Sequence, residues 1–236
     1  MLALAAAACA VRLFNLHLAP VFPAVSMYLV LEAVSASLSI LVAPSTRAYA
    51  WVYLISSSLM WLVSGWAIRE FYADIFSDFP GLAYLGRWSI YIAASVTAVT
   101  SALTIAVVRQ LFADEHTLLI ALEFAGHFLS FGFAVLTAFL LFMISRYPLS
   151  PNRNVVVNCL LFSGILLGEG AGFMVDFFTA RMHTLMVGIS TSLGAAACFG
   201  VWCFLLSPQG QTQVVRIRRH FSPSDEHRLM DQLNAI

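Results

Sequence analysis

The sequence predicts an all-α protein whose helices cross a membrane. Of its 236 residues, 61% are hydrophobic and only 10% are charged, whereas a typical soluble domain carries about 25% charged residues. The mean hydropathy is +0.87. The apolar residues fall in continuous runs, and a membrane-spanning helix needs roughly 20 such residues. We therefore predict a polytopic transmembrane bundle of seven helices, with six as the alternative.

The choice between seven helices and six depends on the first residues. Residues 1–14 are apolar except for Arg12, but fourteen helical residues extend only about 21 Å, less than the roughly 30 Å hydrocarbon core. The segment fits a short spanning helix, a helix that lies in the interface, or a signal peptide. Arg12 follows the apolar run, whereas a signal peptide places its positive charge before it. We favour the short spanning helix.

Six longer apolar runs follow. Pro20, Pro23 and Pro44 mark the turns that bound the first of them, because proline starts helices and interrupts them. The predicted helices cover residues 21–43, 48–76, 85–110, 117–146, 155–178 and 183–206. No loop between them is long enough for a soluble domain. The chain is thus divided into a transmembrane bundle, residues 1–207, and a basic tail, residues 208–236.

The tail is the segment with the clearest aqueous character. Ser222 and Pro223 form a helix-start signal, and apolar side chains then recur on one face up to Ile236. We predict a short amphipathic helix that rests on the membrane, on a protein partner, or on this protein's own loops. Three arginines directly after the last apolar run suit contact with anionic lipid headgroups: Arg216, Arg218 and Arg219.

The distribution of arginine predicts the orientation in the membrane. All 12 basic residues other than histidine are arginine, and positive charge is enriched on the cytoplasmic side of membrane proteins. In a seven-helix arrangement one face carries only Arg47, Arg109 and Arg181, and the other face carries the rest. We therefore place the N-terminus outside and the C-terminus in the cytoplasm, in the inner (plasma) membrane. The formal net charge of zero gives no indication of nucleic-acid binding.

The helix predicted at residues 155–178 has the features of a central helix. Small residues let a neighbouring helix approach closely, which favours association where lipid removes the hydrophobic drive. Residues four apart share one helical face. Glycine and serine recur at this spacing in this helix and in the next one: Gly164, Gly168, Gly172, Gly188 and Ser192. We predict that these positions pack helices against one another.

Four ionisable side chains fall well inside the predicted membrane segments: Glu32, Glu123, His127 and Glu169. Glu123 and His127 are four residues apart and share a helical face. The rise of 1.5 Å per residue places His127 and Glu169 at similar depth. A carboxylate in hydrocarbon costs roughly 2.5–3.5 kcal/mol on insertion scales, so each of these residues should face protein or water. We therefore predict that the four converge into one buried polar cluster.

Four interpretations of this cluster stay open. Hydrogen bonds from the four side chains could fasten helices together. The cluster could relay protons or hold a cation in a transporter, bind a lipid or quinone headgroup, or ligate a metal. Neither H-E-x-x-H nor a P-loop or G-x-S-x-G motif is present, and the lack of lysine excludes a retinal Schiff base. The working function is a non-enzymatic sensor or accessory subunit without cofactor or metal; the alternative is a proton- or cation-coupled small-solute transporter or channel.

Three stretches of the chain are similar to a family of bacterial seven-helix integral membrane proteins that has no assigned function. They cover residues 22–32, 71–88 and 145–154, and include Phe79-Pro80-Gly81 and Tyr147-Pro148. These motifs are turn and interface signals. The resemblance implies seven helices and no particular chemistry.

Overall fold

The computed structural model of the chain is all-α in the part that it describes. It describes residues 1–43, 45–77, 79, 84, 88, 91–92, 95, 99, 117–147, 149, 151–178, 184–213 and 215. The helices are α1 (Leu2–Asn15), α2 (Pro23–Val42), α3 (Thr46–Ile75), α5 (Thr117–Arg146), α6 (Arg153–Phe178), α7 (Thr184–Leu205) and the short 3₁₀ helix η1 (Pro208–Gln211). Five of them, α2, α3, α5, α6 and α7, are long and apolar enough to cross a membrane.

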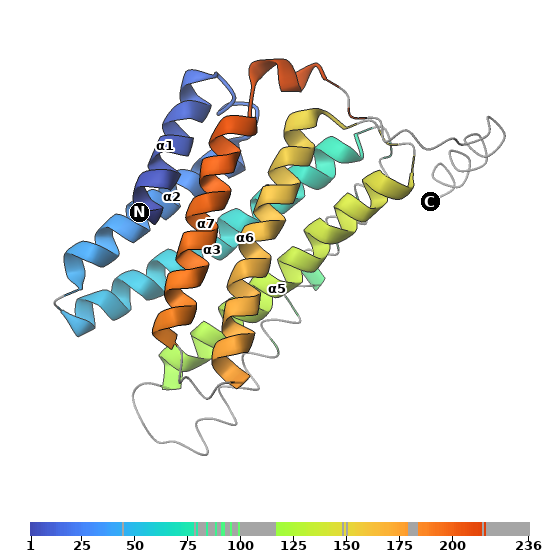
Figure 1. The fold of residues 1–236 in the computed structure, drawn as a ribbon. Helices are drawn as coiled ribbons and strands as arrows, with labels where there is room; N and C mark the ends of the chain where they lie inside the picture. Colours follow the sequence, from blue (N-terminus) through green and yellow to red (C-terminus); the bar gives the residue numbers. More distant parts are fainter. Residues whose placement is uncertain are drawn as a thin grey trace.

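The prediction of seven helices is corrected to six α-helices in the described residues. The predicted helix at residues 85–110 lies almost wholly outside them, as does the tail beyond residue 215, with its predicted helix and its three arginines. α1 is the short helix that the sequence predicts at residues 1–14. It begins about halfway along the bundle (Figure 1) and is not among the five candidate spans.

The helices form a closed ring. α1 packs between α2 and α7, α2 packs on α3, α3 on α5, α5 on α6, and α6 on α7. Figure 1 shows these helices inclined side by side. α6 also contacts α3 and η1, and it is the most buried of the five candidate spans. The helix that the sequence places at the centre is therefore the one with the most neighbours.

One end of the bundle collects most of the described connections, and we call it the η1 end. Helices α1, α3, α5 and α7 end there, and α2 and α6 begin there, at the top of Figure 1. The turn from α1 to α2 includes His17, whose φ of 55° is the left-handed conformation that few side chains adopt. The opposite end holds the start of α3 and of α5, and Ser45 begins α3 by accepting a hydrogen bond from the Ala48 N–H at 3.4 Å.

Aromatic side chains fill the core between α2, α3, α6 and α7. The ring of Phe162 on α6 lies 5.0 Å from that of Tyr28 on α2 and 5.8 Å from that of Phe71 on α3. Both contacts are edge-to-face, and each such pair contributes about 0.5–1.5 kcal/mol beyond its buried area. Phe199 and Trp202 of α7 stack at 6.2 Å and close the core on the fourth side. Phe162 is thus a common packing partner for three other helices.

Buried amides join α6 to the end of α7. The Trp202 indole N–H donates to Asn158 Oδ1 at 2.7 Å, and both side chains are fully buried. One turn earlier, Asn154 Nδ2 donates to the Ser207 carbonyl at 2.8 Å. Polar groups away from water cost free energy unless they are paired, so these two bonds fix the position of α7 and η1 on α6.

The predicted packing glycines differ in their surroundings. A Cβ at Gly172 would lie 2.5 Å from Thr191 Cγ2 and 3.3 Å from Val187 Cγ1, both on α7. A Cβ at Gly164 would lie 3.8 Å from the nearest atom on α7, and one at Gly168 or Gly188 would meet nothing within 4 Å. Ser192 is exposed. The close approach of α6 and α7 therefore occurs at Gly172.

A second close approach joins α3 to α5 at Gly126. A Cβ there would collide with the indole ring of Trp61 on α3. The ring is rigid, so neither group moves aside easily. Glycine is needed at this position for the indole to lie flat against the α5 backbone.

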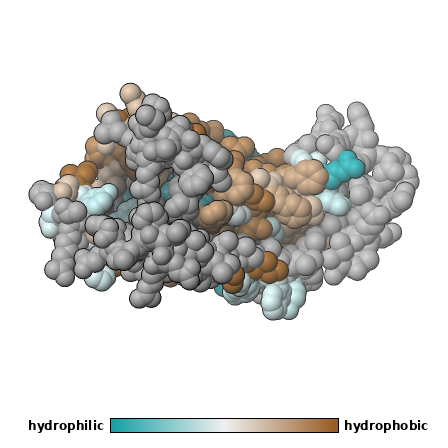
Figure 2. Space-filling view, turned by 90° about the horizontal axis from the view of Figure 1, so that it is seen from below, coloured by the Kyte–Doolittle hydropathy of each residue, from teal (hydrophilic) through white to brown (hydrophobic). Residues whose placement is uncertain are grey.

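The outer surface of the helices is apolar. Figure 2 shows hydrophobic residues over much of the described surface seen along the bundle. Leu62 on α3 and Phe204 on α7 are 71% and 82% exposed. Exposed apolar surface on this scale is typical of contact with lipid. With the length and hydropathy of its helices, the chain is a multi-pass membrane protein whose helices face the bilayer.

Replacement of Gly126 by alanine should destabilise the protein. Overpacking of a filled site costs about 1–3 kcal/mol, and the added methyl group meets Trp61. We expect a lower melting temperature in detergent. Gly168→Ala is the control, because its methyl group enters open space and alanine is the better helix former. Equal melting temperatures for the two variants would contradict the packing at Gly126.

Replacement of Asn158 by leucine should also destabilise the protein, by about 1–3 kcal/mol, because the buried Trp202 N–H then lacks an acceptor. The effect should be largely absent when Trp202 is already phenylalanine. A double-mutant cycle of Asn158→Leu and Trp202→Phe, measured by unfolding in detergent, tests this coupling. Additive effects of the two substitutions would show that the bond contributes nothing.

Candidate functional site

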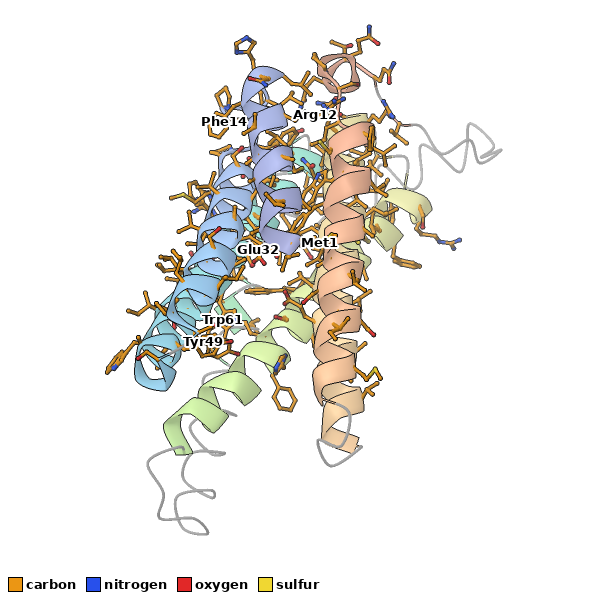
Figure 3. All side chains as sticks on the ribbon, turned by 60° about the vertical axis from the view of Figure 1, so that its left-hand side comes forward. Met1, Arg12, Phe14, Glu32, Tyr49 and Trp61 are labelled. Atoms are coloured by element: carbon orange, nitrogen blue, oxygen red, sulfur yellow. The ribbon has the colours of Figure 1, made fainter. Side chains whose placement is uncertain are left out.

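Two acidic side chains from different helices lie within electrostatic range of each other. Glu32 lies about halfway along α2 (Figure 3), and Glu169 lies on α6. Their carboxylates are close enough to interact electrostatically. The Ser130 hydroxyl, on α5, donates a hydrogen bond to Glu169 Oε2 at 3.1 Å. We call Glu32 and Glu169 the carboxylate pair; with Ser130 it joins three of the helices.

Tyr28 completes the surroundings of the carboxylate pair. It lies one turn before Glu32 on α2, is only 2% exposed, and interacts electrostatically with both Glu169 and Glu32. Among the described residues, no arginine interacts with either carboxylate. In the described part of the chain, the hydroxyl groups of Tyr28 and Ser130 are therefore the polar groups next to the pair.

This arrangement is suited to proton binding. Two like charges at short range repel strongly in a medium of low dielectric constant, and each carboxylate alone is costly within a membrane. A proton held between the two groups reduces both costs, as in other carboxyl dyads. Hydroxyl groups such as those of Tyr28 and Ser130 can both donate and accept hydrogen bonds, so they can adapt to either protonation state.

The structure brings together two of the four residues predicted to cluster. Glu32 and Glu169 approach each other, while His127 is half-buried on α5, three residues before Ser130. The side chain of Glu123 lies outside the described residues. A buried cluster of all four residues is therefore not shown.

A third carboxylate, Glu70 on α3, was not among the site residues predicted from the sequence. Its Oε2 accepts a hydrogen bond from the Ala24 N–H at 3.0 Å. Its Oε1 is buried and has no hydrogen-bond partner in the described part of the chain. Phe22 precedes α2 and has no polar side chain to cap it, so the free N–H groups of the first turn need an acceptor from elsewhere. That missing cap was the available signal.

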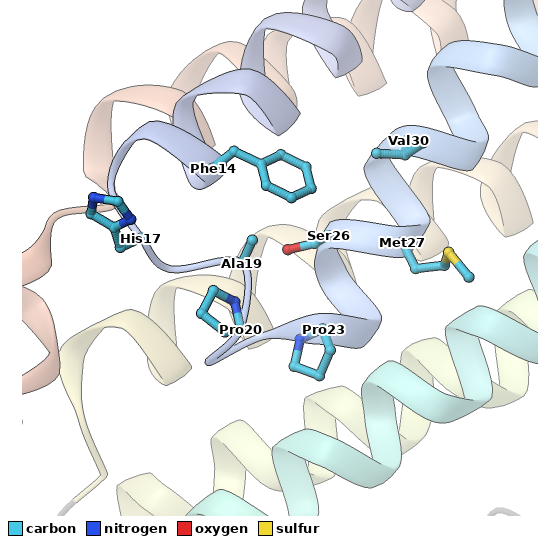
Figure 4. Close-up of a pocket in the computed structure, with 8 residues that line it drawn as sticks. All are labelled: Phe14, His17, Ala19, Pro20, Pro23, Ser26, Met27 and Val30. Carbon is cyan, nitrogen blue, oxygen red and sulfur yellow. The ribbon is translucent and has the colours of Figure 1, made fainter.

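A separate hollow lies on the outer side of the α1–α2 turn (Figure 4). It has a volume of about 580 Å³ and is lined mainly by apolar side chains, among them Phe14, Pro23, Met27 and Val30. The hydroxyl of Ser26, which also lines it, already donates to the Phe22 carbonyl at 2.9 Å. The carboxylate pair is not part of its lining.

The described residues contain no group of three or more His, Cys, Asp and Glu side chains placed to bind one metal ion. Cys9 and Cys159 are buried as free thiols, and Cys198 and Cys203 are half-buried. The polar groups of the described interior are thus carboxyl, hydroxyl, amide and thiol groups.

Replacement of Ser130 by alanine should destabilise the protein by about 1–3 kcal/mol, because the partly buried Glu169 loses its hydrogen-bond donor. Unfolding in detergent at neutral pH measures the effect. Ser145→Ala is the matched control on the same helix, since that hydroxyl bonds only to the nearby Phe142 carbonyl at the exposed end of α5. An equally large loss of stability in Ser145→Ala would show that the bond to Glu169 does not contribute to stability.

The chain matches no protein-family model, no curated protein and no solved structure. The carboxylate pair and the membrane fold therefore supply the grounds for assigning a function.

Proposed function

We propose that this protein is a non-enzymatic sensor or accessory subunit of the bacterial plasma membrane, and that it responds to protonation of the carboxylate pair. The approach of Glu32 on α2 to Glu169 on α6 carries the proposal. When the pair holds a proton, α2 and α6 can keep their contact across the ring, where Tyr28 meets Phe162. When the pair loses it, repulsion between two negative charges pushes the helices apart. A protonation event thereby becomes a change in helix packing, which a partner can detect.

The same proposal includes the seven helices expected from the sequence, with the helix predicted at residues 85–110 among them. α3 and α5 both end at the η1 end, and this parallel arrangement supports the proposal. This count agrees with the resemblance to bacterial seven-helix proteins.

The orientation in the membrane is also part of the proposal. The four arginines whose side chains are described lie in or near the helix ends at the η1 end: Arg12, Arg69, Arg146 and Arg153. Positive charge favours the cytoplasmic side. We place the η1 end in the cytoplasm, with the basic tail beside the lipid headgroups and its helix available to a protein partner.

The predicted cluster extends the carboxylate pair toward α5. Glu123, His127 and Ser130 follow one another at four- and three-residue spacing on this helix, so they share a face. Ser130 already contacts Glu169. We propose that His127 and Glu123 line the same polar region, where a histidine can exchange protons near neutral pH.

The alternative function is a proton- or cation-coupled transporter. Glu70 favours the transporter, because it places a further acidic group between the carboxylate pair and the membrane surface at the η1 end. Transport and sensing differ in flux. A proton flux across vesicles that Glu169→Gln abolishes would favour the transporter, whereas a folded protein without flux favours the sensor.

Infrared spectroscopy of the protein in lipid nanodiscs tests the proton on the pair. We expect a carbonyl band of a protonated carboxylic acid whose intensity depends on pH, and we expect Glu169→Gln and Glu32→Gln each to remove or shift it. Asp74→Asn is the control, because Asp74 is exposed near the η1 end and its replacement should leave that band in place. A band that neither glutamine variant alters would show that the pair holds no proton.

A further inference from the structure

We propose that Glu70 is the group through which protons from the η1 end reach the carboxylate pair. This inference rests on the proposed function, because it assumes that the pair binds a proton. It specifies from which side of the membrane the pair receives its proton, and which residues carry that proton.

The Glu70 carboxylate has one oxygen bound and one oxygen available. Oε2 accepts the Ala24 N–H at 3.0 Å, which holds the side chain at the start of α2. Oε1 is buried and unpartnered in the described part of the chain. A buried acceptor without a donor is costly, and a proton on this oxygen removes that cost. Asp74, one turn closer to the η1 end of α3, is exposed and interacts electrostatically with Glu70. It connects Glu70 to the surface.

One face of α2 leads from the start of that helix, where Glu70 binds the Ala24 N–H, toward the pair. Ala24, Tyr28 and Glu32 recur at four-residue spacing and so share a helical face, and each step along that face covers about 6 Å. Glu70 is bonded to the first of these residues, and Glu32 belongs to the pair. Tyr28 lies between them and interacts electrostatically with both carboxylates of the pair.

Buried hydroxyl groups occupy the depth between the two carboxylate positions. At 1.5 Å per residue, Glu70 lies ~8 Å and Ser64 ~16 Å from the η1 end of α3. By the same rise, Ser163 lies ~15 Å and Glu169 ~24 Å from the η1 end of α6. Ser64 and Ser163 are both buried, at 4% exposure. Buried polar side chains therefore occur at the depths between Glu70 and Glu169, with Ser64 on α3 and Ser163 on α6.

One passage moves one proton from Glu70 to Glu169 and leaves Tyr28 and the water unchanged. Glu70 releases its proton from a carboxyl oxygen to a bridging water molecule, which passes one of its own protons to the phenolic oxygen of Tyr28. Tyr28 gives its original hydroxyl proton to a carboxylate oxygen of Glu169. Glu70 is then an anion again and takes its next proton from the η1 end. No bond other than O–H bonds forms or breaks.

The charges around Glu70 suit reversible proton binding. Asp74 on α3 is the charged group that interacts with it, and Asp74 also interacts with the Cys159 thiol on α6. On α2, the group that binds Glu70 is the Ala24 N–H. Among the described residues, no basic side chain interacts with Glu70. A fixed positive charge, which would hold Glu70 as an anion, is therefore lacking in this part of the chain.

The experiment measures how fast the pair takes up a proton. The full chain in lipid nanodiscs is subjected to a rapid pH jump, and the infrared band that Glu169→Gln removes is followed in time. We expect Glu70→Gln to slow the rise of this band by about tenfold or more, as for loss of a positioned proton donor, while its final intensity stays the same. The glutamine amide oxygen can still accept the Ala24 N–H, so α2 keeps its cap.

Two further variants separate proton transfer from a structural role. Glu70→Asp should recover most of the rate, because it restores a carboxyl group, and Tyr28→Phe should slow uptake as Glu70→Gln does. Unchanged uptake in Glu70→Gln would overturn the inference and leave the proposed function intact. Where Glu70→Gln does not fold, unchanged uptake in Tyr28→Phe overturns it equally. Loss of the pH-dependent band from the wild type would instead overturn the proposed function.

Discussion

The structure depends on one constraint: inside a bilayer, a polar group has only the protein to bond with. The bonds that meet this requirement join different helices. Glu169 of α6 is bound by Ser130 of α5, Asn158 of α6 by Trp202 of α7, and the first turn of α2 by Glu70 of α3. Apolar packing alone gives little preference between one neighbour and another in lipid. These polar contacts therefore fix three neighbour pairs of the ring: α5 with α6, α6 with α7, and α2 with α3.

The carboxylate pair and Glu70 follow from the same constraint in a different way. Each is a polar group whose bonding stays incomplete: the pair has no positive partner, and one oxygen of Glu70 has no donor, in the described part of the chain. Groups of this kind lower stability, and in membrane proteins they mark positions of function. Because Glu32, Glu169 and Glu70 come from α2, α6 and α3, the proposed response to protons is joined to the stability of the ring.

Much of the fold could be predicted because it depends on composition and length. The apolar runs locate α2, α3, α5, α6 and α7, and the constant helical rise places Glu169 deep in α6. The sequence does not predict which neighbour a given helix face contacts. Periodicity shows that Gly168 and Gly172 share a face, but it does not show which of the two packs against another helix. Glu70 was missed for a related reason: its partner, Ala24, is 46 residues away in the sequence. Only the missing cap at Phe22 pointed toward such a contact.

The dependence of α2 on another helix bears on how the protein is assembled. Phe22 offers no hydrogen-bond acceptor in its side chain, and Glu70 supplies one only after nearly the whole of α3 has been synthesised. Until then the beginning of α2 must keep contact with water or headgroups. The two helices therefore reach their final depth together, as a hairpin. The start of α2 takes its final place only after the ribosome has translated Glu70.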